Sequence, residues 1–158
     1  MLSLLDGNHR QEIHMTAHEA ALVGKAGEML VAAELLRRHI DVAYPAHDGG
    51  VDLMAYRGHR LGRVVPIQVK ARTSTCYEFQ KDWFRIEGLV LIQVWHVTQV
   101  PEFYVFNGLR DVEDALGNIH TSTLSWKAKG NYNVTTPNAD HIKRMQGHRD
   151  RWDRITGQ

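Results

Sequence analysis

Apolar residues recur along this chain with two different periods, which separate helices from strands. From Thr16 to about His39 the pattern is helical, and Thr16 and Glu19 have the spacing of a capping box. Further along, the apolar runs become short, and they either alternate with polar residues or are continuously apolar, as in strands. We expect strands at residues 41–44, 51–57, 63–71, 89–97 and 102–106.

The second half of the chain carries weaker signals, and residues 73–87 fit neither period. Beyond the last strand we expect a short helix over residues 109–116 that ends at Gly117, and a loop over 118–136 with one strand around Trp126. A final helix is expected over about 138–155. This order predicts an α/β fold with a mixed central sheet and a C-terminal helix. The 158 residues suit a single domain over 1–158, with a core at about 16–108 and an extension at about 109–158.

Polar residues occupy positions in two strands where one face should be buried. Side chains alternate along a strand, so Gln68 and Lys70 project from one face of the 63–71 strand while its apolar residues project from the other. In the preceding strand, Asp52 lies on the face opposite to Leu53. An acid, an amide and a lysine can therefore meet on one surface of one sheet.

The first helix supplies a further acid, Glu28, on a stripe that is otherwise mostly apolar. A carboxylate there is costly unless a cation or a hydrogen-bond donor meets it. Gly24 and Gly27 each cost roughly 0.5 to 1 kcal/mol relative to Ala inside a helix, which indicates the close approach of a strand or a ligand. The alternative places Glu28 at the margin of the apolar stripe, pointing to water. Glu34, which is flanked by two arginines, is interpreted as a solvated ion-pair partner.

Composition and charge narrow the classes of function. The formal net charge is +1, so nucleic-acid binding would have to come from local clusters of basic residues. Cys76 is the only cysteine, which excludes an intrachain disulfide and favours a reducing compartment. No apolar run reaches the ~20 residues of a membrane span. We expect a cytoplasmic protein with no membrane partner.

Three short segments carry the strongest combined pattern: Gly24-Lys25-Ala26-Gly27-Glu28, then Asp48-Gly49-Gly50-Val51-Asp52, then Gln68-Val69-Lys70. In order, spacing and shared face they resemble the PD-(D/E)XK nuclease superfamily, which has the restriction-endonuclease-like fold. The pattern is most similar to members with Gln in the third motif, such as Mrr-like restriction enzymes and group I intron homing endonucleases. The resemblance covers roughly residues 16–97. It implies a core of helix, three-strand meander, helix and strand, with the second helix within residues 73–87.

The resemblance also implies catalytic roles for Glu28, Asp52, Gln68 and Lys70. Asp52, Gln68, Glu28 and the Val69 carbonyl would bind Mg²⁺, with Mn²⁺ as a substitute, and Lys70 would orient the attacking water and stabilise charge on the phosphate. Gln68 keeps an oxygen donor but lacks the charge of a carboxylate, so metal affinity should fall. Glu28 could restore that charge.

The resulting prediction is a metal-dependent endonuclease that hydrolyses phosphodiester bonds in DNA. One alternative is a weak or inactive nuclease-fold module that binds nucleic acid or a protein partner. Another is a buried ion-pair network without catalysis. We expect DNA contacts from basic residues around the cleft, with a homodimer as a further possibility. The candidates for contact are Lys25, Arg72, Lys143 and Arg144.

Overall fold

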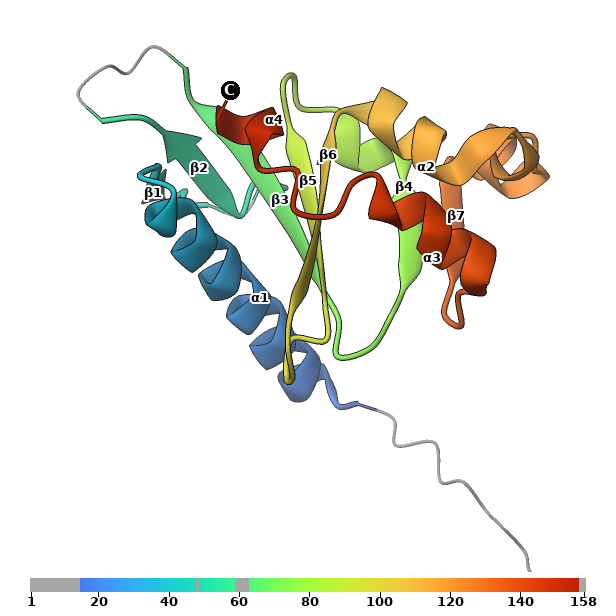
Figure 1. Cartoon of the computed structure of the whole chain (residues 1–158), viewed down its shortest axis with the longest axis horizontal. Coiled ribbons are helices and arrows are strands. Elements are labelled where there is room, and N and C mark those ends of the chain that lie inside the picture. The colour runs from blue at the N-terminus through green and yellow to red at the C-terminus, as the bar shows by residue number, and fades with distance from the viewer. Residues whose placement is uncertain (1–14, 48, 59–62, 157–158) are drawn as a thin grey trace, which may run out of the picture.

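The computed structural model describes residues 15–47, 49–58 and 63–156, so Asp48 of the second motif lies outside the described residues. Figure 1 shows the order of the elements along the chain. They are α1 (Ala17–Arg37), β1 (Asp41–Ala43), β2 (Leu53–Tyr56), β3 (Val65–Ala71), β4 (Tyr77–Gln80), the 3₁₀ helix η1 (Lys81–Phe84), β5 (Val90–Trp95), β6 (Glu102–Asn107), α2 (Leu109–Thr121), the π-helical turn η2 (Ser125–Lys129), β7 (Asn131–Val134), α3 (Ala139–Gln146) and α4 (Asp153–Thr156).

A five-stranded mixed sheet forms the centre of the fold, with the strand order β1-β2-β3-β5-β6. Only β3 and β5 run parallel among these neighbours, and Ile67 of β3 lies between Leu53 of β2 and Val90 of β5. All six residues of β5 are buried, as their mostly apolar run predicts, and Gln93 is the polar residue among them. The predicted α/β class with a mixed sheet is confirmed.

One face of the sheet is covered by α1, which begins at the predicted capping box. The Thr16 hydroxyl accepts a hydrogen bond from the Glu19 amide, and the Glu19 carboxylate accepts one from the Thr16 amide. The helix packs closely on β3, because a Cβ added at Gly27 would overlap the Cβ of Ala71. The close approach predicted from the glycines is therefore confirmed at Gly27. Nothing lies within 4 Å of the same atom added at Gly24.

The opposite face of the sheet is covered by α2, α3 and a second, two-stranded sheet made of β4 and β7 (Figure 1). Aromatic side chains fill this second layer, with Tyr77 and Phe79 of β4 packed edge to face. Phe79 also packs on Phe106 of β6. The sheet is thus buried on both faces, and polar residues on β3 have to be accommodated between layers.

The connection from β3 to β5 differs from the helix that the resemblance implies. It contains the strand β4 and the four-residue η1, and no α-helix. The reason is the alternation of Tyr77 and Phe79 with polar neighbours, which buries both aromatic rings when the segment pairs with β7. A helical conformation would not place both rings in the same core.

The predicted C-terminal helix is interrupted. It begins as predicted, with a capping box at Asn138, but α3 ends at Gln146 and only the short α4 follows. Between them the chain pairs with β6, because the His148 carbonyl accepts from the Val105 amide and the Asp150 amide donates to the Phe103 carbonyl. Satisfying the edge of β6 outweighs continuing the helix.

Two smaller predictions in the extension are also corrected. The helix α2 does not stop at Gly117 but kinks there, where the backbone has φ 68° and the chain then continues to Thr121. Trp126 lies in η2 and not in a strand, and the strand of this region is β7, five residues later. No helix among the described residues has the length and apolarity needed to cross a membrane.

Candidate active site

Gln68 and Lys70 leave β3 on the same face, as the alternation predicts, while Ile67 and Val69 pack in the core beneath α1. Gln68 is buried, with 8% of its surface exposed, and its Oε1 has no hydrogen-bond partner among the described residues. The Lys70 ammonium lies 5.0 Å from the centre of the Trp83 ring of η1, within range of a cation–π contact. The polar face of β3 therefore holds one unsatisfied acceptor and one cation.

Asp52 is fixed against β3 immediately before β2 begins. Its amide donates to the Ile67 carbonyl at 2.8 Å, and its Oδ2 accepts from the Val69 amide at 2.6 Å. A side-chain carboxylate thus satisfies a backbone donor that the neighbouring strand would otherwise bond. The register that pairs Leu53 with Ile67 brings Asp52 alongside Gln68.

Glu28 and Asp52 line the same cavity, which has a volume of about 200 Å³. The Glu28 carboxylate accepts a hydrogen bond from the Lys25 ammonium at 2.6 Å, and this bond raises the pKa of Lys25. Glu28 keeps 20% of its side chain exposed, which is less than the 59% of Lys25. The cavity is lined by Lys25, Glu28, Tyr44, Pro45, Val51 and Asp52.

Glu28 and Asp52, the two acids predicted from the sequence, therefore line one cavity. The cation that bonds to Glu28 is Lys25. Glu34 forms the ion pairs predicted for it, with both Arg37 and Arg38, but its side chain is not the solvated one expected, since it is 18% exposed against 20% for Glu28. The contrast between the two glutamates follows from their faces of α1. Glu28 faces a cavity that also contains Asp52, whereas Glu34 pairs only with its own helix.

Lys70 lines a second, much smaller cavity of about 10 Å³, which approaches the lower limit for one water molecule. Arg72 lines the same cavity, and its guanidinium forms an ion pair with Glu78 of β4 at 2.5 Å. Burial lowers the pKa of Arg72, but the adjacent Glu78 carboxylate outweighs this effect and the net shift is upward. The two predicted cations are thus held by residues of the connecting segment that sequence reasoning left unassigned.

Trp83 and Glu78 were the functional candidates missed by the sequence, because their roles depend on where the 73–87 segment crosses the sheet. In η1, Trp83 follows Asp82, and no pattern in the sequence distinguishes a tryptophan that contacts Lys70 from one that packs in the core. Glu78 is held beside the central sheet by the hydrogen bond from Gln93 to its carbonyl and by its ion pair with Arg72, and Trp83 lies against Lys70.

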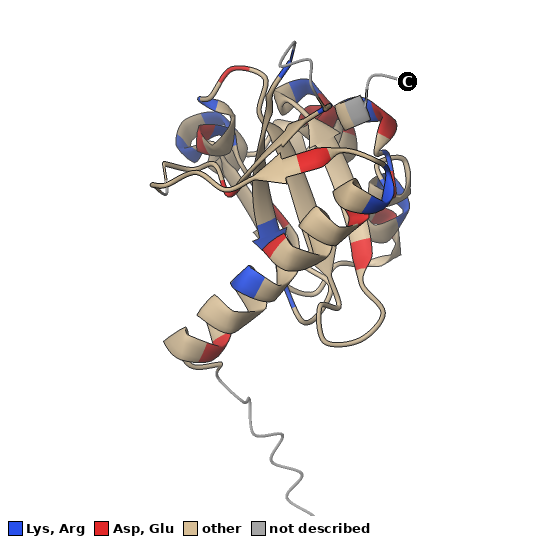
Figure 2. Ribbon diagram, turned by 90° about the vertical axis from the view of Figure 1, so that its left-hand side faces the viewer, with Lys and Arg blue, Asp and Glu red and all other residues tan. Residues whose placement is uncertain are grey.

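Lys143 and Arg144 lie on α3, on the other side of the sheet from α1 (Figure 1). Arg144 forms an ion pair with Asp140 at 2.8 Å, and Lys143 is exposed. Neither residue lines the cavity with Glu28 and Asp52. Figure 2 shows Lys and Arg interspersed with Asp and Glu on the side of the molecule it presents.

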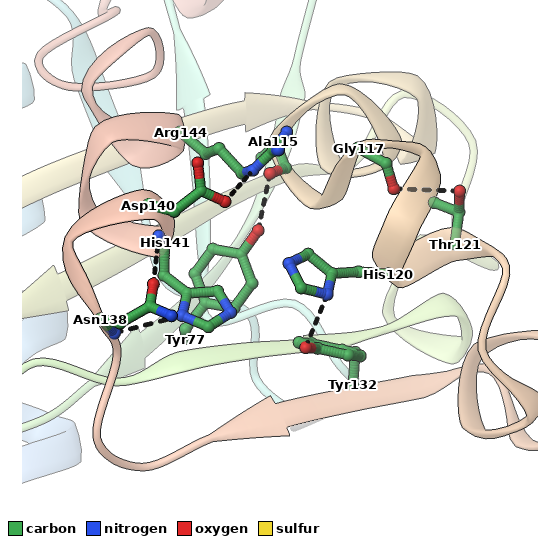
Figure 3. A network of polar contacts seen from close by, with 10 residues as sticks. All are labelled: Tyr77, Ala115, Gly117, His120, Thr121, Tyr132, Asn138, Asp140, His141 and Arg144. Atoms are coloured by element: carbon green, nitrogen blue, oxygen red, sulfur yellow. Dashed lines mark hydrogen bonds and ion pairs between the residues drawn. The ribbon is translucent and has the colours of Figure 1, made fainter.

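Arg144 borders a polar network between α2, α3 and β7, shown in Figure 3. The His120 Nδ1 and the Tyr132 hydroxyl are 2.7 Å apart, the Tyr77 hydroxyl donates to the Ala115 carbonyl at 2.6 Å, and the rings of His120 and His141 stack. Burial lowers the pKa of His120 and the neighbouring His141 adds to this effect. These contacts join the helices of the second layer, and none of these residues lines the cavity with Glu28 and Asp52.

The donor set around Asp52 fits a hard divalent cation. Among the residues that the structure describes there is no cluster of three or more His, Cys, Asp or Glu side chains that could bind a metal. Mg²⁺, however, prefers oxygen ligands, keeps several of its waters and needs only one or two protein carboxylates. The strand register places Gln68, with its unsatisfied Oε1, opposite Asp52, so the two side chains offer oxygen donors from neighbouring strands that such an ion could use.

Comparison with solved structures identifies a bacterial homing endonuclease, I-Ssp6803I, as similar in fold. The two structures superpose with a TM-score of 0.52 at 16% sequence identity, over 87% of this chain and 93% of that chain. No family model and no curated protein matches the sequence. At this identity the likeness establishes the fold, and this chain shares the fold of that endonuclease over most of its length.

Proposed function

We propose that this chain is a metal-dependent endonuclease that hydrolyses phosphodiester bonds in DNA through a PD-(D/E)XK-type site with Gln in the third motif. The observation that carries the proposal is the buried Gln68 Oε1, which has no partner among the described residues. The strand register places Gln68 opposite Asp52, whose carboxylate is bonded to the Val69 amide. A buried acceptor without a partner costs roughly 1 to 3 kcal/mol, so a position that keeps one suggests a ligand. The fold shared with a homing endonuclease supports the same assignment.

In this proposal Asp52, Gln68, Glu28 and the Val69 carbonyl hold the metal, with Mg²⁺ as the natural ion and Mn²⁺ as a substitute. The ion, when bound, supplies Lewis-acid polarisation of the phosphate and lowers the pKa of coordinated water. The chain's own contribution is orientation. The Val69 amide fixes Asp52, and Glu28 adds the negative charge that Gln68 lacks while Lys25 holds its carboxylate in place.

Lys70 would stabilise negative charge as it develops on the phosphate and orient the attacking water. A lysine whose ammonium is held against Trp83 starts from a restricted position, so less entropy is lost when it engages the substrate. Lys25 and Arg72 would contact flanking phosphates.

The second candidate function is a nuclease-fold module that binds DNA or a protein without cleaving. The observation that favours it is the ion pair between Lys25 and Glu28, which neutralises part of the charge that a metal site with Gln68 would require. Metal binding would then be weak, and the basic residues would bind DNA without cleavage. This alternative predicts DNA binding that does not depend on a divalent ion.

Cleavage of supercoiled plasmid with Mg²⁺ or Mn²⁺ tests the choice. Glu28→Gln should abolish cleavage, whereas Glu34→Gln, an equally acidic position on the same helix, should cleave like the wild type. Lys70→Ala should remain folded by far-UV circular dichroism and lose cleavage. DNA retention in a filter-binding assay without any product, across both metals and several DNA structures, would favour the binding module.

A further inference from the structure

The outer face of α1 exposes large apolar side chains at intervals of seven residues. Leu22, Met29 and Leu36 are 57%, 61% and 57% exposed, although leucine and methionine of this size are usually buried. Seven residues make nearly two helical turns, so the three side chains lie in one line along the helix. We call Leu22, Met29 and Leu36 the α1 stripe.

The surroundings of the α1 stripe suit close packing of another helix. Ala26 and Ala33 lie four residues after Leu22 and Met29, on the adjoining positions of the same face, and small residues there allow two backbones to approach. Residues 15–22 are all exposed, so the first turns of α1 have little tertiary support, and in Figure 2 they extend away from the body of the protein. Helical turns without packing are marginal in water, which indicates that a partner covers them.

We propose that the α1 stripe is the interface of a homodimer in which α1 pairs antiparallel with α1 of a second copy. The spacing of the stripe is symmetric about Met29, so a two-fold axis at this residue places Leu22 against the second copy's Leu36 and Met29 against its own equivalent. Such an isologous match arises only when the partner is the same chain in the reversed direction.

Charge at the two ends of the stripe selects the antiparallel direction. Glu19 lies near the N-terminal end of α1 and Arg37 at its C-terminal end. In the antiparallel arrangement each Glu19 approaches the second copy's Arg37, whereas a parallel pair would bring like charges together at both ends. Apolar register and charge therefore favour the same geometry.

The length of the helix sets the strength of the pairing. At 1.5 Å per residue the 21 residues of α1 extend about 31 Å, and a single helix pair of that length buries an area at the small end of specific interfaces, near 1,200 Å². We expect a dissociable dimer with a Kd on the order of micromolar, so its population should rise with protein concentration.

The pairing has a consequence that rests on the proposed function. Glu28 immediately precedes Met29, so both copies of the Glu28 and Asp52 cavity would lie close to the two-fold axis. A two-fold axis perpendicular to both helices keeps the direction along the axis unchanged. Equivalent side chains that point along the axis therefore lie on the same side of the dimer in both copies. The two sites would then open on the same side and could act on the two strands of a single duplex.

Disulfide crosslinking under mild oxidation tests the pairing without reference to activity. Met29→Cys alone should give a crosslinked dimer, because the two equivalent thiols meet at the axis. Leu22→Cys and Leu36→Cys should each remain uncrosslinked, while the double variant with both changes should crosslink. The wild type serves as a control because its own Cys76 is buried. Crosslinking of all three single variants would show a parallel pair and overturn the proposal.

Sedimentation equilibrium is a second test of self-association. Leu36→Glu should abolish self-association, whereas Leu124→Glu, at a leucine that is 83% exposed outside the stripe, should dimerise like the wild type. A wild type that is monomeric up to about 100 µM would overturn the proposal. If the dimer forms, the wild type should convert supercoiled plasmid directly to linear DNA and Leu36→Glu should stop at nicked circles. A crosslinked dimer that cleaves no DNA would refute the proposed function alone.

Discussion

The same face of the central sheet carries two buried glutamines on neighbouring strands, in opposite surroundings. Gln93 of β5 is 3% exposed and donates from its Nε2 to the Glu78 carbonyl at 2.5 Å, whereas Gln68 of β3 is 8% exposed and its Oε1 has no partner among the described residues. The two residues are of the same type and are both buried, so the difference between them is in their hydrogen bonds. Gln93 therefore joins the central sheet to the second layer, whereas none of the residues that the structure describes bonds to the Gln68 oxygen.

Removing charge beside Gln68 should have the largest effect on activity. Asp52→Asn keeps an oxygen that accepts from the Val69 amide but removes a carboxylate from the proposed metal site. We expect a loss of about 10²- to 10³-fold in the rate of DNA cleavage with little change in melting temperature. Asp52→Ala should lose cleavage and also destabilise the fold by about 1 to 3 kcal/mol, because the Val69 amide loses its acceptor. Equal melting temperatures for the two variants would show that this hydrogen bond contributes nothing.

In the second layer, on the side of Gln93, a change of pH should alter the stability of the protein and not metal binding. Burial, together with Arg154, lowers the pKa of His148 to about 4, and its Nδ1 lies 2.8 Å from Arg154. Because the folded pKa lies below the unfolded value of about 6.5, this stabilisation is present above pH 6.5 and is lost as the pH falls toward 4.

We expect a loss of about 2 to 3 kcal/mol in the free energy of unfolding between pH 7 and pH 4 from this group, measured by urea denaturation. His148→Gln should flatten that dependence. His18→Gln, at an exposed histidine of α1, should leave it unchanged. An unaltered slope in His148→Gln would contradict the assignment.

Replacing each glutamine by leucine tests the comparison itself. Gln93→Leu should destabilise the protein by about 1 to 3 kcal/mol, since the Glu78 carbonyl loses its donor. Gln68→Leu should be neutral or stabilising by about 1 kcal/mol, since it removes an unsatisfied oxygen. Thermal denaturation without divalent ions measures both. A Gln68→Leu variant as unstable as Gln93→Leu would mean that Gln68 is a structural residue.

The smallest effect is expected at the two glycines of α1. Gly24→Ala should stabilise the helix by about 0.5 to 1 kcal/mol, because open space surrounds the position. Gly27→Ala should instead be destabilising by about 1 kcal/mol or more, because the new methyl group would overlap Ala71. If Gly24→Ala nevertheless weakens DNA binding in a fluorescence-anisotropy titration, Gly24 marks a surface that the DNA backbone approaches closely. Unchanged affinity would remove Gly24 from the site.

The parts of the fold that were predictable are those fixed by local chemistry. The capping box placed the start of α1, and the alternation in β3 correctly separated Gln68 and Lys70 from Ile67 and Val69. The close approach of a strand or a ligand was predicted from Gly24 and Gly27, and the structure shows β3 in that place at Gly27.

The parts that were not predictable depend on distant pairings. The break between α3 and α4 arises because Arg149 and its neighbours bond to β6, more than forty residues earlier in the chain, which no local pattern encodes. In the same way, the contact of Lys70 of β3 with Trp83 of η1 joins two segments whose meeting no local pattern encodes. For the candidate site, the sequence indicated which residues share a face, but the tertiary structure decides which of them share a cavity.

The most direct test of the central claim is the anomalous scattering of crystals grown with Mn²⁺. We expect one strong peak per chain, within about 2.0 to 2.3 Å of an Asp52 carboxylate oxygen and Gln68 Oε1, which disappears in Asp52→Asn. Crystals soaked at saturating Mn²⁺ that show no peak at Asp52, or an equal peak in Asp52→Asn, would contradict it.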